Sequence, residues 1–441
     1  MMARAHGSRT ARAARWAMAA SPARAMSAAV PEALEFGKAI VWGKGSLGMR
    51  PSEGMQRQLE NLSVAPLKPT PLNTLTDQRI TDMTFSLTGG AAVTEGGKLW
   101  TWGTNKHVLG LGGKVVSVPV PRPVKALADT NVVQVALGDK HGAAIGEGGF
   151  LFTWGYGGFP FWRQGALGHG DRVDQPQPAV VEAFLEEDSD EPKTRVVQVG
   201  CGAEHMAALD DEGNVWAWGE GESGLLGSGM FAASLPRLVD FEEEGIKCSR
   251  IAVGAGFTLA LDVDGRVWCW GRNGHGQLGL GEDAAVDIQS SESIPSVVPH
   301  FPADEEAIVD IAAGGRCSIA LGKSGRVYCW GDRIHMRPFH VSHFTDNALL
   351  NEGEIIVRVA AGHGAFGVLT SEGRIFTFGN GSFSGATGQG VTSGAMTPAI
   401  LSGLGENSAA QLILAGKSGA MITGSPPSAV RAPLVPFSAR S

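Results

Sequence analysis

Three glycine-rich stretches of the sequence have the residue spacing of a dinucleotide-binding loop. The stretch GRNGHGQLG (271–279) contains Gly274, Gly276 and Gly279 in the order Gly-x-Gly-x-x-Gly, which lets backbone approach a pyrophosphate. The same spacing recurs at residues 43–48 and 219–224. A dinucleotide loop must also open a helix, and the residues after Gly279 (LGEDAAVDIQSSESIP) contain no long amphipathic helix. Three copies without a helix predict the turns of a repeat rather than a nucleotide site.

Other residues able to do chemistry also lack the spacing that their chemistry needs. Both GKS triplets, at 322–324 and 416–418, lack the glycine that a phosphate loop requires five residues earlier. The five cysteines contain no C-x-x-C pair and are predicted to pack as ordinary residues in a reducing compartment. His335, His340 and His343 form a loose cluster, for which a solvated loop is favoured over a zinc site. We therefore expect no catalytic residue, no metal and no cofactor.

The first 31 residues differ in composition from the rest of the chain. They contain five arginines and no acidic residue, which is typical of a mitochondrial presequence. A disordered basic tail and a chloroplast address are the alternatives.

The remainder of the chain is acidic. The whole chain has 36 Lys and Arg against 44 Asp and Glu; removing five arginines leaves 31 against 44, a net charge near −13. Such a surface argues against general nucleic-acid affinity, and no direct DNA binding is expected. The sequence contains no run of 18 apolar residues, so no membrane span is expected.

Six windows of 24 residues align without gaps when each ends on Trp-Gly or Phe-Gly. They cover residues 80–103, 132–155, 196–219, 248–271, 308–331 and 356–379. Each reads as three short strands separated by glycine-rich turns, and a downstream xPxxV segment such as LPRLV (235–239) supplies a fourth. Four-stranded units repeated around an axis predict an all-β propeller.

The two ends of the repeat region complement each other. Residues 39–48 have the Trp-Gly strand without the strands that precede it, whereas residues 410–423 have the early strands without Trp-Gly. Pairing them makes a seventh blade and closes the ring, which removes a free sheet edge. We predict a propeller over residues 36–423 and a disordered tail over 424–441.

The repeat resembles that of the regulator of chromosome condensation family over nearly all of residues 36–423. The resemblance rests on GRVWCWGRNGHGQLGLGED (265–283) and on the Gly-x-x-His-x-x-Ala-Leu element GAEHMAAL (202–209). It implies a seven-bladed propeller, with His141 and His205 as core residues hydrogen-bonded within their blades. The structural repeat residues are Trp42, Gly43, Trp102, Gly103, Trp154, Gly155, Trp218, Gly219, Trp270, Gly271, Trp330 and Gly331, together with these two histidines.

Plant UV-B photoreceptors share this fold and sense light through tryptophans of a Gly-Trp-Arg-His-Thr motif. The matching stretches here are GAEHM, GAGFT and GGRCS, which lack the tryptophan. Photoreception is therefore not expected.

One insertion is a candidate partner-binding loop. Residues 155–171 place aromatic side chains and an arginine in a loop, the composition that interface hot spots favour. In the Ran exchange factor of the family, a protruding wedge follows the comparable Trp-Gly. Aromatic side chains folded back onto the propeller are the alternative. The candidate binding residues are Phe159, Phe161, Trp162, Arg163 and Gln164.

Three acidic loops, at residues 182–193, 241–245 and 302–307, would attract a basic partner if they gathered on one face. Taken together, these features predict a mitochondrial-type family member, a monomer in the matrix that acts as a non-enzymatic interaction scaffold. The resemblance makes organelle RNA processing, ribosome assembly or respiratory-complex biogenesis plausible settings. The alternative function is guanine nucleotide exchange on a small or organellar GTPase; chromatin binding is disfavoured by the acidic body.

Overall fold

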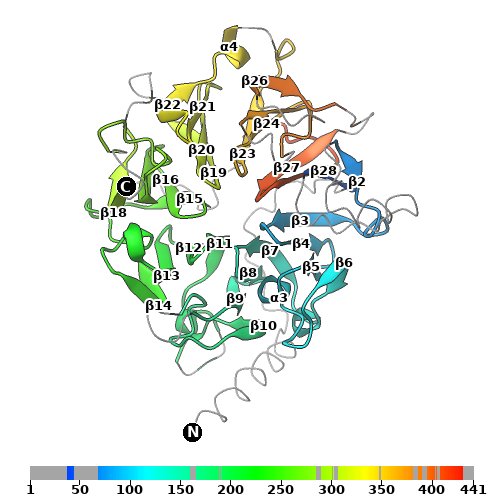
Figure 1. Cartoon of the computed structure of the whole chain (residues 1–441), viewed down its shortest axis with the longest axis vertical. Helices are drawn as coiled ribbons and strands as arrows, with labels where there is room; N and C mark the ends of the chain where they lie inside the picture. The colour runs from blue at the N-terminus through cyan, green and yellow to red at the C-terminus, as the bar shows by residue number, and fades with distance from the viewer. Residues whose placement is uncertain are drawn as a thin grey trace.

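The computed structural model is a ring of seven four-stranded antiparallel sheets, viewed along its axis in Figure 1. It describes residues 37–43, 68–158, 165–187, 189, 191–284, 290–299, 301, 306–346, 349–380, 386–389, 395–402, 404 and 408–430. The predicted presequence, 1–31, and residues 431–441 of the predicted tail lie outside these ranges. The prediction of a seven-bladed all-β propeller is confirmed.

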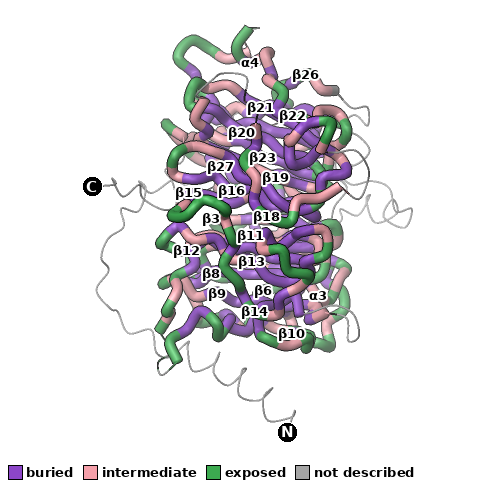
Figure 2. The backbone as a smooth tube through the Cα atoms, turned by 90° about the vertical axis from the view of Figure 1, so that its left-hand side faces the viewer, coloured by how far each residue is buried: buried purple, intermediate pink, exposed green. Residues whose placement is uncertain are grey.

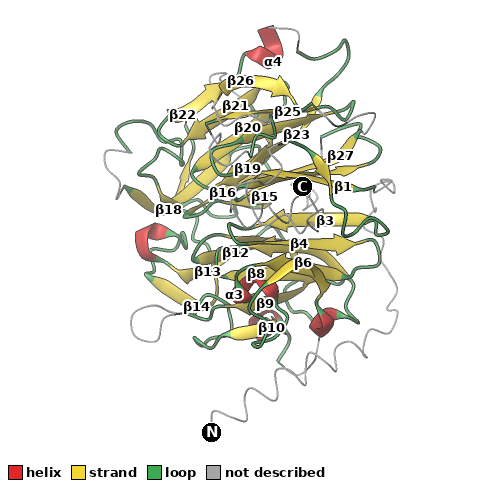
Figure 3. Ribbon diagram, turned by 45° about the vertical axis from the view of Figure 1, so that its right-hand side comes forward, coloured by secondary structure: helices red, strands yellow, loops and turns green. Residues whose placement is uncertain are grey.

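Six blades are built from consecutive strands of the chain. Blade 1 is β3 to β6 (Ile80–Phe85, Gly89–Thr94, Leu99–Gly103, Val118–Pro123), blade 2 is β7 to β10 (Val132–Leu137, His141–Gly146, Phe150–Gly155, Gln175–Val180), and blade 3 is β11 to β14 (Val196–Cys201, His205–Asp210, Val215–Glu220, Ala232–Leu238). Blade 4 is β15 to β18 (Cys248–Val253, Phe257–Asp262, Val267–Arg272, Ser291–Val297), blade 5 is β19 to β22 (Ile308–Gly314, Cys317–Gly322, Val327–Gly331, His335–His340), and blade 6 is β23 to β26 (Ile356–Ala361, Phe366–Thr370, Ile375–Gly379, Ala395–Ile400). Short helices lie between the strands, as Figure 3 shows: α3 (Lys106–Leu109), η1 (Lys125–Leu127), η2 (Glu182–Phe184), η3 (Glu222–Gly224) and α4 (His343–Asp346).

Blade 7 joins the two ends of the propeller. It combines β27 (Ala409–Ala415) and β28 (Ser418–Thr423) with β1 (Ala39–Gly43) and β2 (Thr70–Pro71). β1 pairs with β28 over its whole length, from Ala39 opposite Ile422 to Gly43 opposite Ser418. The predicted closure by N-terminal and C-terminal strands is therefore confirmed.

The outer strand of every blade contains proline, from Pro71 in β2 to Pro398 in β26. Proline has no N–H to offer a neighbouring chain, so it protects the exposed sheet edge from further pairing. In blades 1 to 6 the register also shifts where the outer strand meets the third strand.

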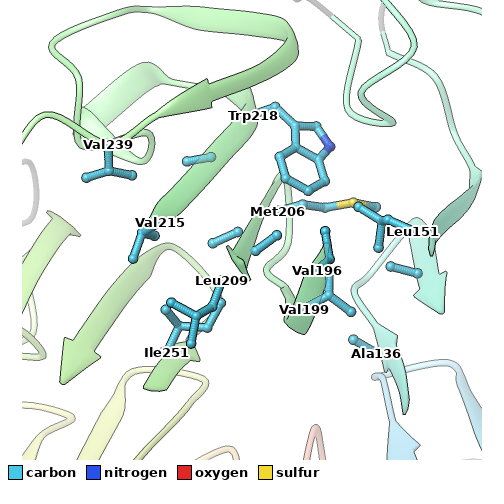
Figure 4. Packing of buried hydrophobic residues seen from close by; sticks show 14 of the residues in the cluster. Ala136, Leu151, Val196, Val199, Met206, Leu209, Val215, Trp218, Val239 and Ile251 are labelled. Carbon is cyan, nitrogen blue, oxygen red and sulfur yellow. The ribbon is translucent and has the colours of Figure 1, made fainter. Parts of the chain in front are cut away.

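The hydrophobic core lies between neighbouring blades, and the buried tube in Figure 2 follows the inner strands. Figure 4 shows one such layer, in which Met206 and Trp218 of blade 3 pack in the same cluster as Leu151 of blade 2 and Ile251 of blade 4. Each sheet therefore buries both faces by stacking on its neighbours.

A tryptophan from one blade docks onto the loop of the preceding blade. The indole Nε1 of Trp330 in blade 5 donates to the carbonyl of Gln277 in blade 4 at 2.9 Å. Trp154, Trp270 and Trp42 donate in the same way to Val108, Leu225 and Ala386. A glycine lies under each of these indoles: a Cβ on Gly279, whose φ is +76°, would lie 2.9 Å from Trp330 Nε1. The third glycine of the fingerprint thus makes room for a neighbouring tryptophan.

Side chains of the inner strands bind the backbone of the next blade. Gln134 accepts from the backbone N–H of Val199 at 3.0 Å, and Gln198 accepts from Ile251 at 2.8 Å. Blade 4 has Arg250 at the repeat position of these glutamines, and the Arg250 guanidinium pairs with Asp310 of blade 5 at 3.3 Å. The Asp310 carboxylate also accepts a hydrogen bond from the backbone N–H of Val359 in blade 6 at 3.1 Å. The blades are thus joined around the axis by polar contacts as well as by packing.

Candidate interaction site

Two sets of connections gather on one face of the ring, which we call the loop face. Because the strands of each blade alternate in direction, the first-to-second turns and the third-to-outer loops share this face. A cavity of about 460 Å³ lies on the axis and is lined by the inner strands of all seven blades. The turns that follow these strands form its mouth.

The mouth is acidic on the side of blades 2 and 3. Burial raises the pKa of Asp139, with Glu204 adding to the shift and Lys140 opposing it. Glu204 pairs with Arg272 at 3.4 Å. Among the described residues, the Asp139 carboxylate has no cationic side chain within ion-pair distance, although its backbone carbonyl accepts from Asn105 at 2.9 Å.

The loop face is basic on the side of blades 5 and 7: Arg316 lines the cavity, Lys417 lies in the turn after β27, Arg333 lies in the hairpin between β21 and β22, and all three are exposed. We call these three residues the basic arc. Arg316 Nη1 donates to His275 Nε2 at 2.8 Å, and Arg333 Nε donates to the Gly274 carbonyl at 3.3 Å. Within the part of the chain that the structure describes, these cations have no carboxylate partner. No sequence motif indicates them, because each occurs in a different turn.

Two histidines of the mouth are held neutral. Burial lowers the pKa of His275, and Arg316 and Arg333 lower it further. Burial also lowers the pKa of His363, with Lys417 adding to the effect and Asp332 opposing it.

The hairpin of blade 5 is strained at the rim. Asp332 and Arg333 have φ values of 53° and 58°, in the left-handed region that non-glycine residues rarely adopt. Their N–H groups donate to the Arg316 and His275 carbonyls, both at 2.9 Å. Strained non-glycine backbone of this kind is concentrated at functional sites.

The predicted binding residues Phe159, Phe161, Trp162, Arg163 and Gln164 lie outside the described residues. The base of their loop is on the loop face, where Gly157 N donates to Asp174 at 2.9 Å and Ala166 N donates to the Gly157 carbonyl. The Tyr156 ring contacts the His107 ring edge to face, and Lys140 Nζ lies 5.7 Å from the centroid of the Tyr156 ring.

The predicted structural residues lie in the strands. The tryptophans of all six Trp-Gly pairs are fully buried in third strands, and the glycine that follows each has a positive φ. His141 and His205 are buried at the start of second strands. The expectation that they bond within their blades needs correction, because His205 Nε2 contacts Thr258 Oγ1 of blade 4 at 3.1 Å. The packing of blade 3 against blade 4 supplies this partner from a neighbouring sheet.

The residues weighed for metal or thiol chemistry are dispersed. His335 stacks on Phe339 at 4.0 Å, whereas His340 lies against Tyr328. In the described residues there is no group of three or more His, Cys, Asp or Glu that could hold a metal ion. Burial raises the pKa of all five thiols, which makes them poor nucleophiles.

Two further findings concern the periphery. The three acidic loops all connect an outer strand to the next inner strand, so their described residues lie on the side opposite the loop face, while residues 188, 190 and 302–305 lie outside the described ranges. No helix in the described ranges is long and apolar enough to cross a membrane.

Comparison with known proteins adds a family match. The profile of the RCC1-like domain matches residues 38–333. The human E3 ubiquitin-protein ligase HERC2 is 34% identical over 283 residues, which are 62% of this chain and 5% of HERC2. The ultraviolet-B receptor UVR8 of Arabidopsis thaliana is 30% identical over 294 residues, 66% of this chain and 60% of the receptor. The chain thus spans less than two thirds of the length of these relatives.

A solved structure shares the whole ring. Prp20p from Saccharomyces cerevisiae, whose crystal structure was described with its binding properties to Gsp1p and histones, has a TM-score of 0.70 at 21% identity. The match covers 88% of this chain and 92% of Prp20p. At this identity the likeness establishes the fold alone.

Proposed function

Because this chain belongs to the RCC1-like domain family, we propose that it is a non-enzymatic docking platform for other proteins in the mitochondrial matrix. The observation that carries the proposal is the loop face, where exposed charges and the base of the aromatic loop surround an open channel mouth. The opposing blade faces are packed against one another, which leaves the loops as the variable part of the fold. The arginine-rich, acid-free residues 1–31 support the matrix location.

Proximity labelling in cells tests this function. A fusion of the full chain to a labelling enzyme should reside in mitochondria and label a reproducible set of matrix proteins. Substituting Tyr156→Ala together with Lys140→Gln on the loop face should deplete this set, whereas Lys323→Gln on the opposite face should not. Cytosolic residence of the fusion, or an identical labelled set for all variants, would contradict the proposal.

Guanine nucleotide exchange is the second candidate function. It is supported by the position of the 155–171 insertion in the sequence, directly after the third-strand Trp-Gly of blade 2, and by the location of its described ends on the loop face. The relative Prp20p, whose structure was described with its binding to Gsp1p, makes a GTPase a reasonable partner class.

This candidate predicts faster release of labelled GDP from a GTPase that copurifies with the protein. Trp162→Ala combined with Arg163→Ala should abolish the acceleration, while Lys323→Gln should preserve it. Unchanged GDP release in the presence of the wild-type protein would rule the exchange function out for that GTPase.

A further inference from the structure

We propose that the basic arc of Arg316, Arg333 and Lys417 binds an acidic segment of a partner protein at the channel mouth. This inference rests on the docking function and specifies the chemistry of one partner. The chain as a whole carries a net charge of −8, yet on this rim three exposed cations have no carboxylate partner among the described residues.

The donors of the arc remain available to a ligand. Arg316 uses one N–H toward a histidine nitrogen and Arg333 uses one toward a backbone carbonyl. A guanidinium has five N–H donors arranged as a fork that matches a carboxylate, so most of them are free to bind one. His275 and His363 beside the arc are neutral near pH 7 because burial and the neighbouring cations lower their pKa.

The hairpin of blade 5 gives access to the arc. In blades 1 to 4 the loop between the third and outer strands spans 11 to 19 residues, whereas β21 ends at Gly331 and β22 begins at His335. Only residues 332–334 intervene, so no long loop of blade 5 stands over Arg316. The left-handed backbone of Asp332 and Arg333 makes this hairpin tight and sets the position of Arg333.

A protein segment fits this surface better than a nucleic acid does. Asp139 lines the same cavity, Glu204 lies close enough to raise its pKa, and Asp332 lies in the hairpin of Arg333; these carboxylates would repel the continuous phosphate backbone of an extended strand. The cavity of about 460 Å³ lies within the range of ligand pockets and could accept a few side chains. A short protein segment that presents carboxylates to blades 5 and 7 avoids this repulsion and is small enough for the cavity.

Fluorescence anisotropy on the full-length protein tests the proposal. The probe is a fluorescein-labelled peptide of four Asp-Gly repeats, compared with a peptide of four Lys-Gly repeats and with an octameric uridine oligonucleotide. The acidic peptide should bind, and Arg316→Gln with Lys417→Gln should weaken its binding by roughly tenfold or more, because charge-assisted hydrogen bonds are lost. Lys417→Gln alone, at an exposed residue, should weaken binding less and provides a variant expected to fold normally.

Two further variants separate the arc from general charge effects. Lys323→Gln removes an exposed cation of blade 5 on the opposite face and should leave the affinity unchanged, whereas Asp139→Asn should strengthen binding by removing a repulsive carboxylate. Absence of peptide binding, equal loss with Lys323→Gln, or tighter binding of the oligonucleotide would each overturn the proposal. If proximity labelling still recovers loop-face partners in that case, the docking function stands without the acidic segment.

Discussion

The junction between blades 4 and 5 differs from the junction between blades 5 and 6 in how the third strand is anchored. At the first junction, Trp330 donates to the Gln277 carbonyl in the long loop of blade 4, and Ser318 donates to the same carbonyl at 2.7 Å. At the second junction, blade 5 has only a short hairpin, and the equivalent residue of blade 6 is Phe378. The phenyl ring of Phe378 has no N–H, and it stacks on the ring of Phe366 at a centroid distance of 5.3 Å instead.

This difference shows that the loop and the residue that docks onto it form one unit. The indoles of Trp42, Trp154, Trp270 and Trp330 donate to a carbonyl in the loop of the preceding blade, whereas after the short hairpin of blade 5 a phenyl ring fills the space without a polar group to satisfy. Trp218 of blade 3 is an exception, because its buried Nε1 has no hydrogen-bond partner among the described residues. The short hairpin has a functional consequence as well, because it leaves the channel mouth open beside Arg316.

The largest expected effect is the loss of the docked indole. Trp330→Ala should destabilise the protein by about 3–5 kcal/mol, since it removes a fully buried aromatic side chain. Phe378→Ala should destabilise the protein by about 1 kcal/mol less than Trp330→Ala does, because no hydrogen bond is lost with the phenyl ring. Urea unfolding followed by circular dichroism measures both, and a larger cost for Phe378→Ala would break the comparison.

A smaller effect is expected at the glycine beneath the indole. Gly279→Ala should cost roughly 2–3 kcal/mol, combining a left-handed alanine with overlap against Trp330. Gly325 also has a positive φ, +84°, but open space around it, so Gly325→Ala should cost roughly 1–2 kcal/mol. Equal costs for the two substitutions in urea unfolding would show that the indole does not restrict this position.

Exchanging the two ring types sharpens the comparison further. Trp330→Phe should cost about 1–2 kcal/mol through the lost hydrogen bond and the lost buried area. Phe378→Trp should also destabilise by about 1–2 kcal/mol, because the larger ring is overpacked and its N–H meets no loop carbonyl. Thermal unfolding reports both; a stabilised Phe378→Trp variant would contradict this explanation.

The smallest expected effect is a pH dependence of stability at the repeat position where the second strand begins. This position is histidine in blades 2 and 3, Cys317 in blade 5 and Ala365 in blade 6. Burial lowers the pKa of His141 to about 4 and that of His205 to about 3. The unfolded chain therefore binds more protons below pH 6.5, and stability falls as the pH drops from 6.5 toward 4. Between pH 7 and pH 6 each histidine should cost somewhat less than about 1 kcal/mol.

His205→Phe tests this dependence with the residue that blade 4 uses at the same position, Phe257. The variant should lose less stability than the wild type between pH 7 and pH 6 in matched urea titrations. Parallel curves for the two proteins would show that His205 has the same pKa in the folded and the unfolded chain, which would contradict the lowered pKa.

Much of the fold could be predicted because it is encoded within each repeat. The 24-residue windows contain three strands each, and the incomplete ends at Trp42 and at residues 410–423 predict the closure that β1 and β28 make. The outer strand was underestimated: β14 begins at Ala232, whereas the motif LPRLV begins at 235. The proline marks its middle rather than its start.

Contacts between blades could not be read from one window. The partner of His205 is Thr258, 53 residues away, and no spacing rule within a repeat indicates it. The channel mouth was missed for the same reason, since Asp139, Arg316 and Lys417 become neighbours only when the ring closes. A signal did exist: several turns after inner strands carry a charged residue that changes from repeat to repeat, such as Asp139, Glu204, Arg316 and Lys417, which is typical of a binding surface on a fixed scaffold.

The most direct test of the account is a double-mutant cycle between Gly279→Ala and Trp330→Phe in urea unfolding. If the fingerprint glycine serves to dock the neighbouring indole, removing the indole should relieve the overlap, and Gly279→Ala should then cost about 1 kcal/mol less than in the wild type. Strictly additive costs would contradict this role for the Gly-x-Gly-x-x-Gly loop.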